Sequence, residues 1–107
     1  MKLALLNTSI ITSVGTFEIH DISLQEAKEI INKNEFQSYI GHESTAQILT
    51  SLLEKKVVMD RTPFEQQTGQ QALVFKLNGR APEGVILSIA EIEAMGYKFQ
   101  LLTKISD

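Results

Sequence analysis

The sequence of 107 residues lacks cysteine and tryptophan and contains only two prolines. Without cysteine, the chain can form neither a disulfide framework nor a thiolate nucleophile, and every zinc site that uses cysteine is excluded. The two histidines, His20 and His42, belong to no spaced ligand motif. We therefore expect no metal ion and no other cofactor, although a magnesium site made only of carboxylates stays open.

An excess of positive charge is also missing, because the formal net charge is -3 and the isoelectric point is about 5.3. A protein that coats long nucleic acid or an anionic membrane needs a basic face, so neither partner is expected, whereas a small anion in a local pocket stays possible. No apolar run reaches the roughly 20 residues of a membrane span, and the apolar start of the chain stops at Asn7 before a signal-peptide core is complete. We expect a cytoplasmic protein.

Common enzyme signatures are absent, since the sequence has no glycine-rich phosphate loop of either standard type and no Gly-x-Ser-x-Gly nucleophile motif. The composition, 43% hydrophobic and 21% charged, is that of an ordinary globular protein. Such a chain can bury a small core but has no room for a second one. We predict a single domain over residues 1–107.

Hydrophobic periodicity predicts the strands. Strand-like patterns occupy residues 2–6, 17–20, 36–40, 57–59, 72–77 and 97–102. Polar residues with Pro63 between residues 62 and 69 indicate a loop or an edge. Because strands and helical patterns interleave, the sequence predicts an α+β fold with a mixed sheet of about five strands flanked by helices.

Three helices are expected between these strands. Ser23 and Ser88 each begin a capping-box pattern, and Gly96 is placed to end the last helix in a left-handed conformation. The middle helix begins near His42, and Lys55 and Lys56 would lie in its last turn, where cations complement the helix dipole.

Polar residues capable of binding an anion gather at the ends of these elements. Asn7 follows the first strand, and the segment 41–45 leads into the middle helix, whose free N–H groups could hold a phosphate together with the hydroxyls of Ser44 and Thr45. Guanidinium groups bind phosphate through two hydrogen bonds, and Arg61 and Arg80 are the two arginines of the chain.

Each of these residues also has a purely structural interpretation. Ser44 and Thr45 are more often helix caps than ligands, and a histidine at a helix start is more often a surface residue than a catalyst. Arg80 could form an ion pair with Glu83, and the glycines around them could simply be turn residues.

Three pieces of sequence together resemble a known family. They are Gly-His-Glu-Ser-Thr-Ala at residues 41–46, Arg61, and Gly-Arg-Ala-Pro-Glu-Gly at residues 79–84. In residue type and spacing they are similar to the viral ring nucleases, the type III anti-CRISPR family first met in crenarchaeal viruses and found also on bacterial phages and mobile elements. The similarity extends from Asn7 to the final strand.

The resemblance implies a homodimer that binds cyclic tetra-adenylate, the second messenger of type III CRISPR immunity. Such an enzyme would cut the ring without a metal ion into linear di-adenylates with 2′,3′-cyclic phosphate ends. His42 matches the catalytic histidine, which would act as general acid on the departing 5′-oxygen. Arg80 and Glu83 match the other catalytic positions of the family, which would stabilise phosphate charge and orient the histidine or the ribose. The ligand-binding positions of the family are matched by Asn7, Ser44, Thr45 and Arg61.

One position departs from the family. Viral members carry a serine three residues after the asparagine that corresponds to Asn7, whereas this chain has Ile10. A second hypothesis is therefore a binding module, a sponge or sensor of the cyclic nucleotide that does not cleave it efficiently. A third hypothesis is an interaction or nucleic-acid-binding protein of a mobile element, which the acidic isoelectric point disfavours.

Overall fold

The fold of the computed structural model, which describes residues 1–79 and 84–107, is built on one five-stranded sheet. The elements in chain order are β1 (Leu3–Leu6), β2 (Thr16–Ile22), α1 (Leu24–Lys33), β3 (Phe36–Ser38), α2 (Glu43–Leu53), β4 (Gln71–Leu77), α3 (Ile89–Met95) and β5 (Tyr97–Ser106). The strand order is β2-β5-β4-β1-β3, in which β1 is parallel to both β3 and β4, and β5 is antiparallel to β4 and β2. The predicted α+β domain with a mixed five-stranded sheet is confirmed.

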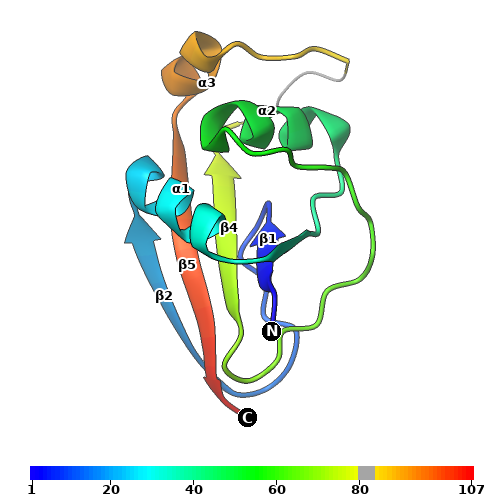
Figure 1. Cartoon of the computed structure of the whole chain (residues 1–107), viewed down its shortest axis with the longest axis vertical. Coiled ribbons are helices and arrows are strands. Elements are labelled where there is room, and N and C mark those ends of the chain that lie inside the picture. Colours follow the sequence, from blue (N-terminus) through cyan, green and yellow to red (C-terminus); the bar gives the residue numbers. More distant parts are fainter. Residues whose placement is uncertain (80–83) are drawn as a thin grey trace.

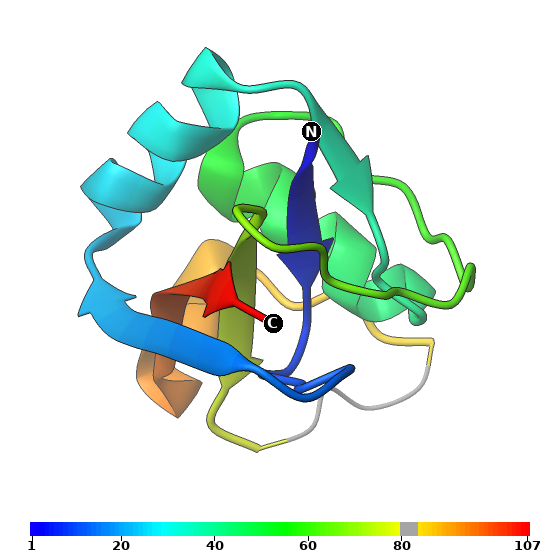
Figure 2. The ribbon, with the colours of Figure 1, turned by 90° about the horizontal axis from the view of Figure 1, so that it is seen from below.

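One face of the sheet carries the larger core. Alternate residues of the strands point to this face, where apolar side chains from all three helices pack on them. Figure 1 shows α2 across the upper ends of β1 and β4, and Figure 2 shows α1 on one side of the sheet. The largest fully buried side chains of this core are Leu5, Ile31, Ile40, Ile48, Leu49, Leu53, Leu73, Phe75, Ile92 and Phe99.

The opposite face of the sheet is covered by connecting segments instead of helices. A smaller buried cluster there consists of Ala4, Leu6, Ala72, Val74 and Leu102. The segment between β1 and β2 crosses this face (Figure 2), where the Ser13 hydroxyl accepts a hydrogen bond from Lys104 Nζ at 2.7 Å. Gln66, on the segment before β4, donates from Nε2 to the Leu102 carbonyl oxygen at 3.1 Å. These contacts hold the two segments against the sheet.

The helix starts at Ser23 and Ser88 form as the capping boxes predict. Each serine hydroxyl accepts the backbone N–H of the glutamate three residues later at 3.1 Å, and each glutamate side chain accepts the backbone N–H of the serine. Gly96 ends α3 with φ of 85°, a conformation that an L side chain rarely adopts. Among the residues described, none of the helices has the length and apolar character needed to cross a membrane.

Two local predictions are wrong. The helix α2 ends at Leu53 because Glu54 adopts a left-handed conformation with φ of 55°, so Lys55 and Lys56 follow the helix instead of lying in its last turn. Residues 57–59 form no strand of the sheet. Side chains bind three of their backbone groups instead of a neighbouring strand. Thr50 Oγ1 bonds both the N–H and the carbonyl of Val57 at 2.9 and 3.2 Å, and Ser38 Oγ donates to the Val58 carbonyl oxygen at 2.6 Å.

Candidate functional site

The parallel arrangement of β3, β1 and β4 brings their carboxyl ends to one edge of the sheet, which we call the carboxyl edge. Asn7 directly follows β1, the segment 39–42 leads from β3 into α2, and Gly79 lies two residues after β4. Open sheets of this kind bind ligands outside the carboxyl ends of parallel strands, because the connecting loops present backbone and side-chain groups there. The carboxyl edge is therefore the candidate functional site.

Backbone hydrogen bonds fix the segments around this edge. The Tyr39 N–H donates to the Leu5 carbonyl oxygen at 3.0 Å, so the chain after β3 continues alongside β1 toward Asn7. The Asp60 N–H donates to the Ile40 carbonyl oxygen at 2.8 Å, which places Arg61 next to Gly41. Arg61 Nε in turn donates to the Gly41 carbonyl oxygen at 3.0 Å.

The N-terminus of α2 lies at this edge with its first N–H groups free of intrahelical partners. His42 is the N-cap residue with extended φ and ψ of -130° and 131°, and its side chain makes no capping hydrogen bond. The first intrahelical bond runs from the Ala46 N–H to the His42 carbonyl oxygen at 3.1 Å. Consequently the N–H groups of residues 43–45 point out of the helix end, where the dipole favours an anion.

Ser44 and Thr45 do not cap the helix, so the structural role expected for them is wrong. Because the chain enters the helix at His42, these two residues are the second and third of the helix and both are half-buried. Their hydroxyls lie in the first turn, beside the free N–H groups. The exposed His42 stands directly before them.

Asp60 holds the backbone turn that carries Arg61. Its carboxylate accepts the Thr62 hydroxyl at 2.6 Å, the Thr62 N–H at 2.9 Å and Gln37 Nε2 at 3.1 Å. The Thr62 hydroxyl and N–H hydrogen bonds keep the pKa of Asp60 below its ordinary value of 3.8, because they stabilise the charged form. Sequence reasoning missed Asp60 and Gln37, although Asp-x-Thr is a recognisable pattern for an aspartate that bonds the backbone two residues later.

The structure brings Asn7, His42, Ser44, Thr45 and Arg61 to the carboxyl edge. The predicted catalytic residues Arg80 and Glu83, and the ion pair considered between them, lie outside the described residues. The glycines on either side are turn residues as expected, since Gly79 and Gly84 have φ of 111° and 72°.

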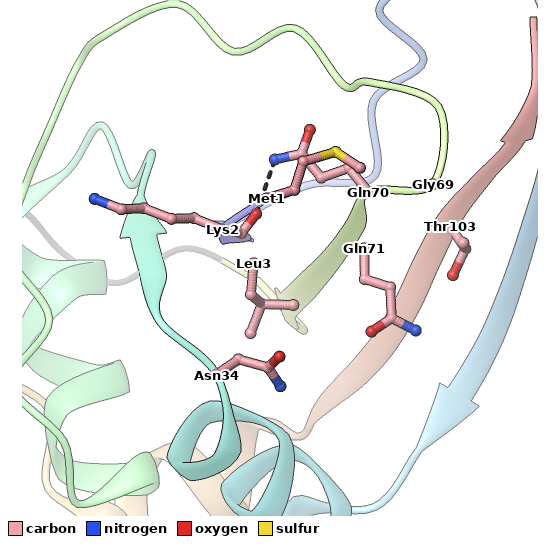
Figure 3. Close-up of a pocket in the computed structure, with 8 residues that line it drawn as sticks. All are labelled: Met1, Lys2, Leu3, Asn34, Gly69, Gln70, Gln71 and Thr103. Atoms are coloured by element: carbon pink, nitrogen blue, oxygen red, sulfur yellow. Dashed lines mark hydrogen bonds between the residues drawn. The ribbon is translucent and has the colours of Figure 1, made fainter.

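A cavity of about 330 Å³ lies at the opposite end of the sheet, near the amino ends of β1 and β4. Figure 3 shows the side chains of Leu3, Asn34, Gln71 and Thr103 around it. None of the predicted site residues that the structure describes lines this cavity. Within residues 1–79 and 84–107, no group of three or more histidines and carboxylates is arranged to hold a metal ion.

Comparison with solved structures finds the same fold in protein B116 of Sulfolobus turreted icosahedral virus. The two share a TM-score of 0.85 at 22% sequence identity, over 96% of this chain and 99% of the viral chain. At this identity, the comparison shows the fold alone.

Sequence comparison finds relatives in a bacterium and in viruses. The uncharacterized protein YddF of Bacillus subtilis (strain 168) is 36% identical over 98% of this chain and 99% of its own. The uncharacterized protein ORF117 of Acidianus two-tailed virus is 35% identical over 96% of this chain and 93% of its own. Protein 26 of a Sulfolobus islandicus filamentous virus is 34% identical over 76% of this chain and 70% of its own. The family model described as STIV B116-like matches residues 3–99, and the chain belongs to this family.

Proposed function

We propose that the protein is a metal-independent ring nuclease that binds cyclic tetra-adenylate and cleaves it to linear di-adenylates. The observation that carries the proposal is the meeting of Arg61, His42 and the free N-terminus of α2 at one edge of the sheet. A guanidinium and a helix N-terminus both bind phosphate, and a histidine between them can transfer a proton.

The cleavage step needs a proton donor for the leaving group. The ribose 2′-oxygen forms a bond to the adjacent phosphorus while the bond from phosphorus to the 5′-oxygen breaks. The 5′-oxygen takes its proton from His42, and the proton of the 2′-hydroxyl passes to water, so the product ends in a 2′,3′-cyclic phosphate. The N–H groups at the start of α2, with Arg61, stabilise the charge that gathers on the phosphoryl oxygens.

Arg80 and Glu83 complete the catalytic set in this proposal. Arg80 adds positive charge at the phosphate, and Glu83 orients His42 or the ribose. Support for both roles comes from the sequence resemblance, which places the two residues between Gly79 and Gly84 after the carboxyl end of β4. Asn7, Ser44 and Thr45 contact the ligand.

We place two copies of the chain around one ring. Cyclic tetra-adenylate has two-fold symmetry, and a two-fold homodimer presents two equivalent sites to it. Exposed apolar side chains near the site support a contact surface, since Ile10 and Ile11 are 43% and 59% exposed on the segment after Asn7. Each subunit then contributes one histidine and one helix N-terminus to the bound ring.

A cleavage assay in EDTA tests the proposal. Purified protein at micromolar concentration is incubated with cyclic tetra-adenylate. The products are separated by chromatography and their masses are measured by mass spectrometry. The proposal predicts linear di-adenylates with the mass of the cyclic phosphate. Bound ring without any linear product contradicts the cleavage, and absence of binding contradicts the whole proposal.

The second candidate is a binding module that retains the ring without efficient turnover. One observation favours it, because Ile10 occupies the position where viral ring nucleases carry a serine and its side chain is 43% exposed. An apolar side chain offers no hydrogen bond to a ribose or phosphate. The variant Ile10→Ser separates the two candidates. If the parent binds the ring with slow cleavage and Ile10→Ser cleaves it faster, the slow turnover of the parent is caused by the side chain at this position.

A further inference from the structure

Two lysines lie directly opposite each other on neighbouring strands of the sheet. Lys76 of β4 and Lys98 of β5 are register partners in the antiparallel pair. Residues that face each other in this way point to the same side, about 5 Å apart at their Cβ atoms. Residues two or four apart on a strand point to the same face. Val74 and Leu102 belong to the smaller cluster, so Lys76 and Lys98 lie on that same face, away from α1.

Two positive charges in this arrangement are unfavourable on a sheet. Like charges directly opposite on adjacent strands repel each other, whereas opposite charges there are favourable. Among the described residues, the only carboxylate within ion-pairing distance of Lys98 is that of Asp21, whose Oδ2 lies 3.9 Å from Lys98 Nζ and is itself largely exposed. No carboxylate of residues 1–79 and 84–107 forms an ion pair with Lys76.

The lysine pair lies next to the candidate site. Lys76 is the last but one residue of β4, and Lys98 is the second residue of β5, so both are at the carboxyl edge. Figure 1 shows the arrowhead of β4 and the beginning of β5 together at the end of the sheet where α2 and α3 lie. In the sheet, β4 is the second strand from β3, and β3 leads into α2, so the lysine pair and the N-terminus of α2 share the carboxyl edge while lying on opposite faces of the sheet.

We propose that Lys76 and Lys98 form a second phosphate-binding position, which extends the anion site from the N-terminus of α2 across the carboxyl edge of the sheet. The inference rests on the proposed function, because it assigns these lysines to another phosphate of the same cyclic oligonucleotide. A ligand with one phosphate at the N-terminus of α2 and a further phosphate that reaches over the carboxyl edge to the opposite face of the sheet uses both positions at once. A bound phosphate offsets the repulsion between the two lysines. The relief of this repulsion therefore makes the free energy of ligand binding more favourable.

The test compares Lys76→Gln with Lys2→Gln. Both variants remove one positive charge, and Lys2 is an exposed residue at the amino end of β1, far along the sheet from Lys76. Binding of cyclic tetra-adenylate is measured by calorimetry at several salt concentrations, and the melting temperature of each free protein is measured in parallel. His42→Ala is present in all proteins so that the ring stays intact.

For Lys76→Gln we expect binding to weaken about fivefold at 0.1 M salt. The slope of log affinity against log salt falls in magnitude by about 0.7 for each lysine–phosphate ion pair that the variant cannot form. The free variant melts at the same temperature as its parent or about 1–3 °C higher, because the repulsion is relieved. Lys2→Gln changes neither the affinity nor the slope.

Two other results overturn the inference in distinguishable ways. Equal affinities and equal salt slopes for Lys76→Gln and Lys2→Gln reject the lysine pair as a phosphate position and leave the proposed function standing. A parent protein that does not bind the ring at any salt concentration rejects both the proposed function and the second position.

Discussion

Arg61 Nε donates a hydrogen bond to the carbonyl oxygen of Gly41 at 3.0 Å, which attaches the arginine to the residue directly before His42. This contact uses one of the five N–H groups of the guanidinium and leaves the two terminal nitrogens for a ligand. For the proposed ligand, the arginine is thereby oriented before binding. Preorganisation of this kind reduces the entropy cost of binding.

Replacement of Arg61 by lysine should therefore weaken ring binding nearly as much as replacement by alanine. A lysine ammonium cannot bond the Gly41 carbonyl oxygen and also present a planar pair of donors to a phosphate. We expect about a tenfold loss of affinity for either variant, measured by calorimetry with cyclic tetra-adenylate. An Arg61→Lys protein that binds as tightly as the parent contradicts the two-donor role.

Asp60→Asn should loosen the turn that carries Arg61. The charged carboxylate accepts two hydrogen bonds from Thr62, and an amide accepts them more weakly. Because the pKa of Asp60 in the folded protein is below its ordinary value of 3.8, the contribution of this carboxylate to stability is complete above that value. It is lost as the pH falls through the folded pKa.

The pH dependence of the melting temperature checks this prediction. Part of the parent's acid destabilisation below about pH 4 should be missing in Asp60→Asn, since the amide does not titrate. Thr62→Val is the matched variant, because it removes the hydroxyl donor and leaves the carboxylate. In Thr62→Val the pKa of Asp60 should move upward toward 3.8, as NMR titration of the carboxyl would show. An unchanged pKa contradicts the assigned cause.

Ser88→Ala should destabilise the protein by about 1 kcal/mol, because it removes the hydroxyl that caps α3. Ser23→Ala removes the same hydrogen bond from α1 and serves as the matched comparison. Urea unfolding of the two variants should give similar losses with an unchanged denaturant slope. A stability equal to that of the parent would mean that the capping boxes contribute nothing in solution.

Phe75→Ala should be the most damaging of the stability variants. The Phe75 ring is 1% exposed and packs against the rings of Phe99 and Tyr97 with centroid distances of 5.3 and 5.9 Å. Loss of a buried phenylalanine of this kind costs about 3–5 kcal/mol. The control is Ile105→Ala, whose side chain is 49% exposed and whose removal should cost less than about 0.5 kcal/mol. Similar losses for the two variants contradict the placement of the core.

The fold could be predicted from the sequence wherever one local signal decided the structure. The capping boxes at Ser23 and Ser88 and the positive φ of Gly96 depend on neighbouring residues only, so the pattern was sufficient. Residues 57–59 have the composition of a strand, but the side chains of Thr50 and Ser38, 7 and 20 residues away, bond their backbone. Side-chain hydrogen bonds and strand pairing compete here for the same backbone groups. The three-dimensional contacts decide the outcome, which a single sequence does not show.

The site could be predicted in part. Asn7 follows β1 and His42 begins α2 after β3, and the parallel pairing of β3 with β1 brings those ends together. Arg61 follows no strand, and the bond from the Asp60 N–H to the Ile40 carbonyl oxygen, which the sequence does not show, places it beside Gly41. The roles of Ser44 and Thr45 as caps were predicted wrongly, because the choice of N-cap depends on where the chain leaves its extended conformation. Lys76 and Lys98 are 22 residues apart in the numbering, and only the strand register shows that they are partners.

The assignment of His42 as proton donor is the central claim, and one comparison tests it most directly. Parent and His42→Ala are incubated in EDTA with cyclic tetra-adenylate, and the rate of linear product and the affinity for the ring are both measured. We predict that the variant binds the ring within about threefold of the parent affinity and that its cleavage rate falls by a factor of about 10² or more. Cleavage by His42→Ala at the rate of the parent would contradict the account.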